Sequence, residues 1–200
     1  MQDASDRPYH HGDLRRALIE TALAILQEER GWQFTLRELA RRAGVSHAAP
    51  YKHFADKAAL LAEIALIGFE KLREALLAAQ TAQPANDRDA LLPAARAYLG
   101  FARRNPALYR LMFGAEAGEP AAVHLDDRAR GAFAVVVEFL ERGQAAGLIR
   151  KREALGQATA CWALLHGLAM LELDGLLLRE KVGEDAVEAA LATLLEGLAA

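Results

Sequence analysis

The sequence has only one cysteine, and nothing in it is typical of a secreted or membrane-bound chain. Cys161 by itself leaves no internal disulfide, which suits a reducing compartment. No uncharged apolar run reaches the roughly eighteen residues that a membrane span needs. The N-terminal segment MQDASDRPYHHGDLRR lacks the apolar middle of a signal peptide. We therefore expect a cytoplasmic protein with no membrane partner.

The motifs of common enzymes and metal sites are also missing. No glycine-rich phosphate loop, HExxH or GxSxG pattern occurs, and Cys161 has no neighbouring cation to lower its thiol pKa. His10 and His11 are adjacent, so their side chains point in different directions, and no cysteine or carboxylate spacing completes a ligand set. We expect no enzyme activity, no metal and no cofactor.

Apolar residues make up 53% of the 200 residues, and β-branched side chains are scarce beside alanine and leucine. This composition favours an all-α fold with a substantial core. Helical periodicity predicts about nine helices, with a linker over 81–87 and a break at Asn105-Pro106. The predicted ranges are 13–29, 36–43, 47–53, 58–80, 88–104, 107–113, 121–146, 152–171 and 184–198.

The stretch Phe34 to Lys57 has the outline of a helix-turn-helix. Thr35 with Glu38 forms a capping box, Gly44 permits a tight turn, and Ser46 can cap a second short helix. The second helix of such a unit can enter a DNA major groove. Pro50 is awkward there because it lacks an amide, and a 3₁₀-like start would relieve it.

The net charge of −3 is unusual for a DNA-binding protein, but the charge is unevenly distributed. Residues 37–57 contain five Lys/Arg and only two Asp/Glu, whereas residues 58–200 contain fifteen Lys/Arg and nineteen Asp/Glu. The pattern indicates a small basic face on an acidic body. Arg7 in the polar segment 1–9 either extends that face as a basic arm or belongs to a disordered tail.

The segments LRELARRAGVS and YKHFADKAALL resemble the N-terminal domain of the TetR family of transcription regulators. The family pattern of Tyr-x-x-Phe, a cap and a lysine falls on Tyr51, Phe54, Asp56 and Lys57. CWALLHGLAMLELDG further resembles the C-terminal domain class marked by Trp, His and Gly, here Trp162, His166 and Gly167. The resemblance implies a DNA-binding domain over 1–60 and a ligand-binding and dimerisation domain over 61–200, joined by the long helix 58–80.

The resemblance implies a homodimer that reads a palindromic double-stranded operator, with repression as the family default. Phosphate contacts are expected from the amide-rich helix start at Thr35 and from Tyr51 and Lys57. Base edges are expected to meet Ser46, His47, Ala48 and Lys52, where His47 can donate or accept and Ala48 can touch a thymine methyl. Arg41 is a further candidate for DNA contact, although Arg41 and Arg42 also suit a solvated helix face. Ala49-Pro50 departs from the commonest family pattern.

The C-terminal half is expected to bind an unidentified, apolar small-molecule effector among the helices between 88 and 171, and to dimerise through 152–171 and 184–198. The helix at 152–171 carries no formal charge over Ala158–Met170, which predicts burial on nearly every side. Aromatic and sulfur-containing side chains can line the pocket, although each also suits an ordinary core position. The candidates are Tyr109, Met112, Phe113, Phe133, Trp162 and His166.

Two other functions fit the same fold. Cys161 or the histidines can make the protein a redox- or metal-responsive regulator. Alternatively, the fold can serve as a protein-interaction module that binds no DNA. Neither the operator, the regulated genes nor the effector follows from the residues.

Overall fold

The computed structural model describes residues 11–29, 31–80 and 91–199, and these residues form helices joined by turns and short loops. The all-α prediction is confirmed. Arg7, His10, the side chain of His11 and the predicted linker 81–87 lie outside the described residues. The α-helices are α1 (His11–Glu29), α2 (Leu36–Arg42), α3 (Lys57–Gln80), α4 (Leu92–Arg104), α5 (Pro106–Phe113), α6 (Pro120–His124), α7 (Asp127–Ala145), α8 (Ala154–Leu173), α9 (Arg179–Val182) and α10 (Ala186–Leu198), with 3₁₀ helices η1 (Pro50–Lys52) and η3 (Ala115–Ala117).

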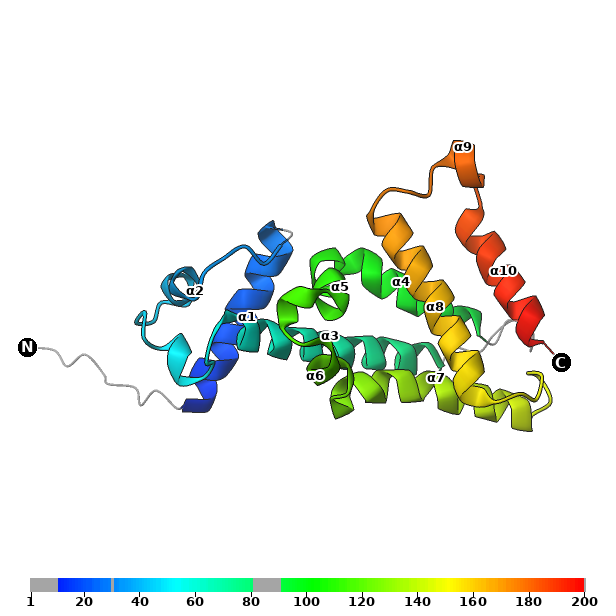
Figure 1. The fold of residues 1–200 in the computed structure, drawn as a ribbon, viewed down its shortest axis with the longest axis horizontal. Coiled ribbons are helices and arrows are strands. Elements are labelled where there is room, and N and C mark those ends of the chain that lie inside the picture. Colours follow the sequence, from blue (N-terminus) through cyan, green and yellow to red (C-terminus); the bar gives the residue numbers. More distant parts are fainter. Residues whose placement is uncertain (1–10, 30, 81–90, 200) are drawn as a thin grey trace, which may run out of the picture.

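The long helix α3 is the axis of the molecule (Figure 1). It begins where Asp56 Oδ1 accepts a hydrogen bond from the Ala59 amide at 2.8 Å, as a helix cap should. Its N-terminal end packs against α1, and the rest of it packs most extensively against α7, α4 and α5. The helix predicted over 58–80 is thereby confirmed.

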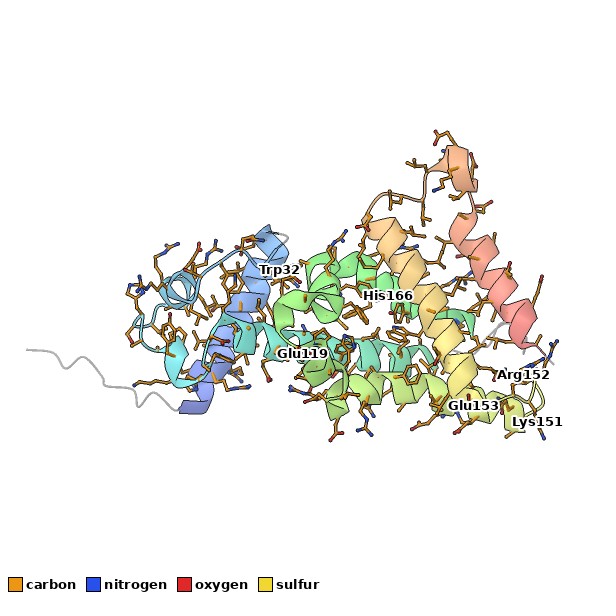
Figure 2. The ribbon with its side chains drawn as sticks, viewed as in Figure 1. Trp32, Glu119, Lys151, Arg152, Glu153 and His166 are labelled. Atoms are coloured by element: carbon orange, nitrogen blue, oxygen red, sulfur yellow. The ribbon has the colours of Figure 1, made fainter. Side chains whose placement is uncertain are left out.

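One apolar core runs through both ends of the chain. It joins Leu18 of α1 and Leu39 of α2 to Leu60 and Phe69 of α3, and continues as far as Leu191 of α10. Trp32, labelled near the end of α1 in Figure 2, packs against the same core. Because the core is continuous, a displacement of α3 is transmitted to α1 and α2 as well as to the helices of the C-terminal half.

The prediction of a single helix over 121–146 is wrong. The chain forms α6, turns at Leu125 and Asp126, and begins α7 at Asp127. Asp126 caps the new helix by accepting a hydrogen bond from the Arg128 amide at 2.9 Å. The side chain of Arg128 then reaches Glu63 on α3, with Nη1 3.0 Å from Oε1. The capped turn at Asp126 separates α6 from α7, and the ion pair attaches the start of α7 to α3.

The prediction that the uncharged helix at 152–171 is buried on nearly every side is also wrong within one chain. One side of α8, including Cys161 and Leu165, is buried against neighbouring helices. Elsewhere around the helix, Leu155, Trp162 and Leu171 are exposed by 56%, 38% and 42%. By length and composition α8 could cross a membrane, but core helices pass the same test, and α8 packs on α4, α7 and α10.

Candidate nucleic-acid interface and ligand cavity

The helix-turn-helix unit is held by caps and a small core. The Glu38 amide donates to Thr35 Oγ1 at 3.1 Å, which confirms Thr35 as the cap of α2. Gly44 adopts φ +68°, a conformation that favours glycine, and lets the Val45 amide reach the Ala40 carbonyl at 3.0 Å. The apolar side of α2 is buried, so its polar side faces outward.

The α-helix predicted over 47–53 is replaced by a turn over 47–49 followed by η1. Pro50 has no amide to offer the Ser46 carbonyl, which instead accepts from Ala49 at 2.9 Å. The next bonds also span three residues, from Lys52 to Ala49 and from His53 to Pro50. Pro50 itself is buried, so the residue that prevents a regular helix also anchors the segment to the core.

The predicted DNA-contacting side chains lie on the outside of this unit. Tyr51 is 55% exposed. Lys57 is half-buried, with its ammonium 5.4 Å from the centre of the Phe34 ring. This cation–π contact is a structural reason for a lysine at a helix start, where the helix dipole disfavours it. The exposed members are Thr35, Arg41, Ser46, His47, Ala48, Tyr51 and Lys52.

Arg41 and Arg42 differ in their surroundings. Arg42 Nη1 lies 2.9 Å from Glu28 Oε2 of α1, and its guanidinium is 3.9 Å from Glu38. The ion pair of Arg42 with Glu28 therefore joins α2 to α1. Arg41, the preceding residue, is also exposed.

A cavity of about 530 Å³ lies inside the C-terminal half. Its wall is mainly apolar, and it contains one ring from each of six successive helices. Phe69 and Phe113 meet edge to face at 5.5 Å between centroids, and the Phe133 and Trp162 rings meet at 6.2 Å. The six rings are those of Phe69 (α3), Tyr98 (α4), Phe113 (α5), His124 (α6), Phe133 (α7) and Trp162 (α8).

A chain of hydrogen bonds runs inward from Tyr98 of this wall. The Tyr98 hydroxyl lies 2.8 Å from the Tyr109 hydroxyl, and Tyr109 in turn lies 2.8 Å from His166 Nδ1. Burial raises the pKa of Tyr98 to about 12 and also raises the pKa of Tyr109. Burial, together with the nearby His124, lowers the pKa of His166. A neutral His166 can accept from Tyr109, which leaves the Tyr109 oxygen to accept from Tyr98.

Residues 18–64 match the family profile described as bacterial regulatory proteins, tetR family, and residues 91–198 match that of a tetracyclin repressor-like C-terminal domain. The second match spans more than half of the 200 residues. The chain belongs to the TetR family. Its members are DNA-binding transcription regulators, and the match over residues 18–64 includes α2 and η1 of this TetR-family protein.

Individual relatives agree with this assignment. The chain is 33% identical over 143 residues to the nucleoid occlusion factor SlmA of Alteromonas mediterranea, a match that covers 70% of this chain and 68% of that protein. A protein of unknown function from Rhodococcus sp. RHA1 shares 37% identity and a TM-score of 0.81, covering 98% and 100% of the two chains. A tetR-family regulator from Shewanella sp. PV-4 shares the fold at 21% identity and a TM-score of 0.67, covering 94% and 98%.

Of the six residues predicted for the pocket of this TetR-family chain, Phe113, Phe133 and Trp162 line the cavity. Tyr109 and Met112 are buried in the core at 0% and 1% exposure, and His166 lies behind the wall, on the side of α8 that faces α4 and α5 (Figure 2). The prediction missed Phe69, Tyr98 and His124. Phe69 shares a helix face with Leu72 and Leu76, which also line the cavity, and that spacing was a usable signal.

Cys161 forms part of the cavity wall and is buried. Burial raises the pKa of its thiol to about 11, so the thiol stays protonated at neutral pH. Among the described residues no group of three or more His, Cys, Asp or Glu side chains is arranged to hold a metal ion. These surroundings give no support to a redox or metal sensor in this part of the chain.

Glu63 of α3 connects the two halves of the molecule. Its carboxylate lies 3.1 Å from Arg15 of α1 and 3.0 Å from Arg128 of α7. Burial raises the pKa of Glu63, but the hydrogen bonds and charges of Arg128 and Arg15 outweigh burial and hold it below its ordinary value. The carboxylate is therefore ionised at neutral pH and links the DNA-binding end to a helix of the cavity wall.

Proposed function

We propose that this protein is a homodimeric repressor that binds a palindromic operator and releases it when an uncharged small molecule occupies the cavity. The observation that carries the proposal is the position of α3. Leu60 and Ile64 of this helix belong to the core shared with the helix-turn-helix unit, while Phe69, Leu72 and Leu76 line the cavity. A molecule that enters the cavity therefore pushes directly on the helix that supports the DNA-binding unit.

The DNA-binding roles are assigned by exposure and chemistry. Ser46, His47, Ala48 and Lys52 are exposed on the turn and η1, and we assign them to the major groove. Thr35, Arg41 and Lys57 flank this segment, Tyr51 lies within it, and we assign these four residues to the phosphates. Ala48, Ala49 and Pro50 leave few polar reading groups. Specificity therefore rests chiefly on His47 and Lys52, with a contribution from DNA shape.

The open side of α8 supports a homodimer formed by α8 and α10. Leu155, Trp162 and Leu171 expose apolar surface along α8, and α10 lies beside it in Figure 1. Exposed apolar surface of this kind marks an interface. In such a dimer, bound effector shifts the distance between the two η1 segments away from the roughly 34–36 Å that separates successive major grooves.

The two domains proposed are 1–60 for DNA binding and 61–200 for ligand binding and dimerisation, in a cytoplasmic protein. The matches over 18–64 and 91–198 support this division. Since α3 is continuous from Lys57 to Gln80, the boundary falls inside a helix, and the two domains move as connected bodies.

A gel-shift titration with DNA from upstream of the protein's own gene tests the proposal. We expect sequence-specific retardation that survives an excess of unrelated DNA, with a mobility and stoichiometry of two chains per site. If unrelated DNA abolishes the retardation as well as unlabelled upstream DNA does, the protein is not a sequence-specific regulator. The protein-interaction module is then the better interpretation.

A further inference from the structure

Among the residues that the structure describes, the wall of the cavity has no buried charge. The Asp, Glu, Lys or Arg side chains in this described wall are Arg130 and Glu138, and both are exposed. Arg130 also has Asp127 within 3.9 Å. A charged ligand placed among the rings would lose its hydration without gaining a buried partner, which is strongly unfavourable. The wall therefore selects against anions and, because no carboxylate is buried there, offers a cation only the faces of its rings.

Most polar groups of the wall already have partners. The Tyr98 hydroxyl is engaged by the Tyr109 hydroxyl, as described above. The Thr159 hydroxyl donates to the Leu155 carbonyl at 2.8 Å on the exposed flank of α8. The Cys161 thiol is a weak hydrogen-bonding group. These groups leave little that can orient a ligand.

His124 is the exception. Its ring lines the cavity and is half-buried between Phe69 and Phe113, with centroids 5.3 and 5.6 Å away. Burial lowers the pKa of His124 and favours the neutral ring. A neutral imidazole carries a proton on one ring nitrogen and a lone pair on the other, so one of its nitrogens can accept a hydrogen bond from a ligand.

We propose that the cavity binds an uncharged aromatic molecule whose hydroxyl or N–H group donates a hydrogen bond to the imidazole of His124. The ring system of the ligand lies among the six rings of the wall, where edge-to-face and offset contacts stabilise it. The volume of about 530 Å³ is within the range of cavities that hold drug-sized molecules. This inference rests on the proposed ligand-responsive function and specifies the chemistry of the ligand.

Calorimetric titration of the full chain, without DNA, tests the ligand class with four matched probes. These are 2-naphthol, 2-methoxynaphthalene, 2-naphthoate and a naphthyl trimethylammonium salt. We expect 2-naphthol to bind about tenfold more tightly than 2-methoxynaphthalene, which can accept but not donate, and both charged probes to bind more weakly still. Tightest binding by either charged probe, equal affinity of the two neutral probes, or no binding below about 1 mM overturns the proposal.

Two variants locate the acceptor. His124→Phe keeps a ring of similar size but removes the lone pair, so the preference for 2-naphthol should fall from about tenfold to about twofold or less. Thr159→Val removes the aliphatic hydroxyl that lies in the described part of the wall and should leave the preference unchanged. A preference that persists in the first variant, or that is lost in the second, assigns the contact elsewhere. The titrations contain no DNA, so a negative result contradicts only the proposed ligand class. Sequence-specific operator binding is tested separately by the gel shift.

Discussion

The DNA-binding end and the cavity are built in opposite ways. The DNA-binding unit comes from one continuous stretch, residues 34–57, and its working side chains point outward from a small core. The cavity takes one ring from each of six helices between Phe69 and Trp162, and these rings point inward. A surface made from neighbouring residues depends on local turns and caps, whereas an interior wall depends on how distant helices pack. The first can change its contacts one residue at a time, but the second changes as a whole.

The two ends are nevertheless one mechanical unit. They share α3 and a continuous core, and Glu63 joins Arg15 of α1 to Arg128 of α7. The two ends are thus built differently but are mechanically connected. The following substitutions test both points.

The largest effect is expected from cavities made in the shared core. Leu39→Ala at the DNA-binding end and Leu111→Ala in α5 both truncate side chains that are 0% exposed. Each should lower the free energy of unfolding by about 2–5 kcal/mol. Urea denaturation followed by circular dichroism, at fixed protein concentration, should show a single transition in both variants. Leu125→Ala, at a position 69% exposed, is the control. Two separate transitions would show that the ends fold independently.

A smaller effect, confined to the DNA-binding surface, is expected for His47→Ala. If His47 contacts a base edge, its loss should remove about 1–3 kcal/mol of discrimination at one operator position. Selection from a random DNA pool measures the preferred site of each protein. The unfolding midpoint should stay where it is, because His47 is exposed. Recovery of an identical site by the variant would remove His47 from the reading residues.

Lys57→Ala should weaken binding to all DNA sequences alike. Loss of one phosphate contact should flatten the dependence of log affinity on log salt by about 0.9. The matched control is Lys151→Ala, an exposed lysine at the opposite end of the molecule in Figure 2. Because Lys57 also covers the Phe34 ring, thermal unfolding must be compared in parallel. An unchanged salt slope with weaker binding would mean that Lys57 acts through packing.

The smallest effect is expected from the charge that joins the two ends. The pKa of Glu63 is held below its ordinary value in the folded protein, so its ion pairs stabilise the fold above about pH 4.3 and that stabilisation is lost as pH falls through the lower, folded value. Glu63→Gln should therefore reduce the free energy of unfolding by about 1 kcal/mol or less at neutral pH, and by progressively less in acid. Glu20→Gln, which breaks an exposed pair with Arg16, is the control. A difference between wild type and Glu63→Gln that does not change with pH would contradict the ionic link.

Local chemistry made much of the DNA-binding end predictable. Thr35, Gly44 and Asp56 act at the turns and caps where their side chains or backbone freedom are needed. Pro50 predicts a 3₁₀-like start to the helix over 47–53, and the structure has a turn and the 3₁₀ helix η1 there without a regular helix after them. The missing amide and the burial of the proline ring together favoured η1.

The breaks and surfaces of the C-terminal half were harder to predict. Asp126 looks like one more polar residue in a helical pattern, and only its bond to the Arg128 amide and the reach of Arg128 to Glu63 show why α6 and α7 separate. The uncharged stretch of α8 predicts burial on nearly every side, but within one chain Leu155, Trp162 and Leu171 of this helix are exposed. Apolar character alone does not tell a helix inside a domain from one that awaits a second subunit.

The sequence by itself determined the fold class, the helix-turn-helix and the family, because caps, turn glycines and apolar spacing act over a few neighbouring residues. Tertiary structure decided which rings meet. Phe69, Tyr98 and His124 share no motif with Phe113, Phe133 and Trp162, and only the packing of α4 to α8 with α3 places them on one cavity wall. The same packing gives most polar groups of that wall hydrogen-bond partners within the protein. His124 is the wall residue that we expect to accept a hydrogen bond from the ligand.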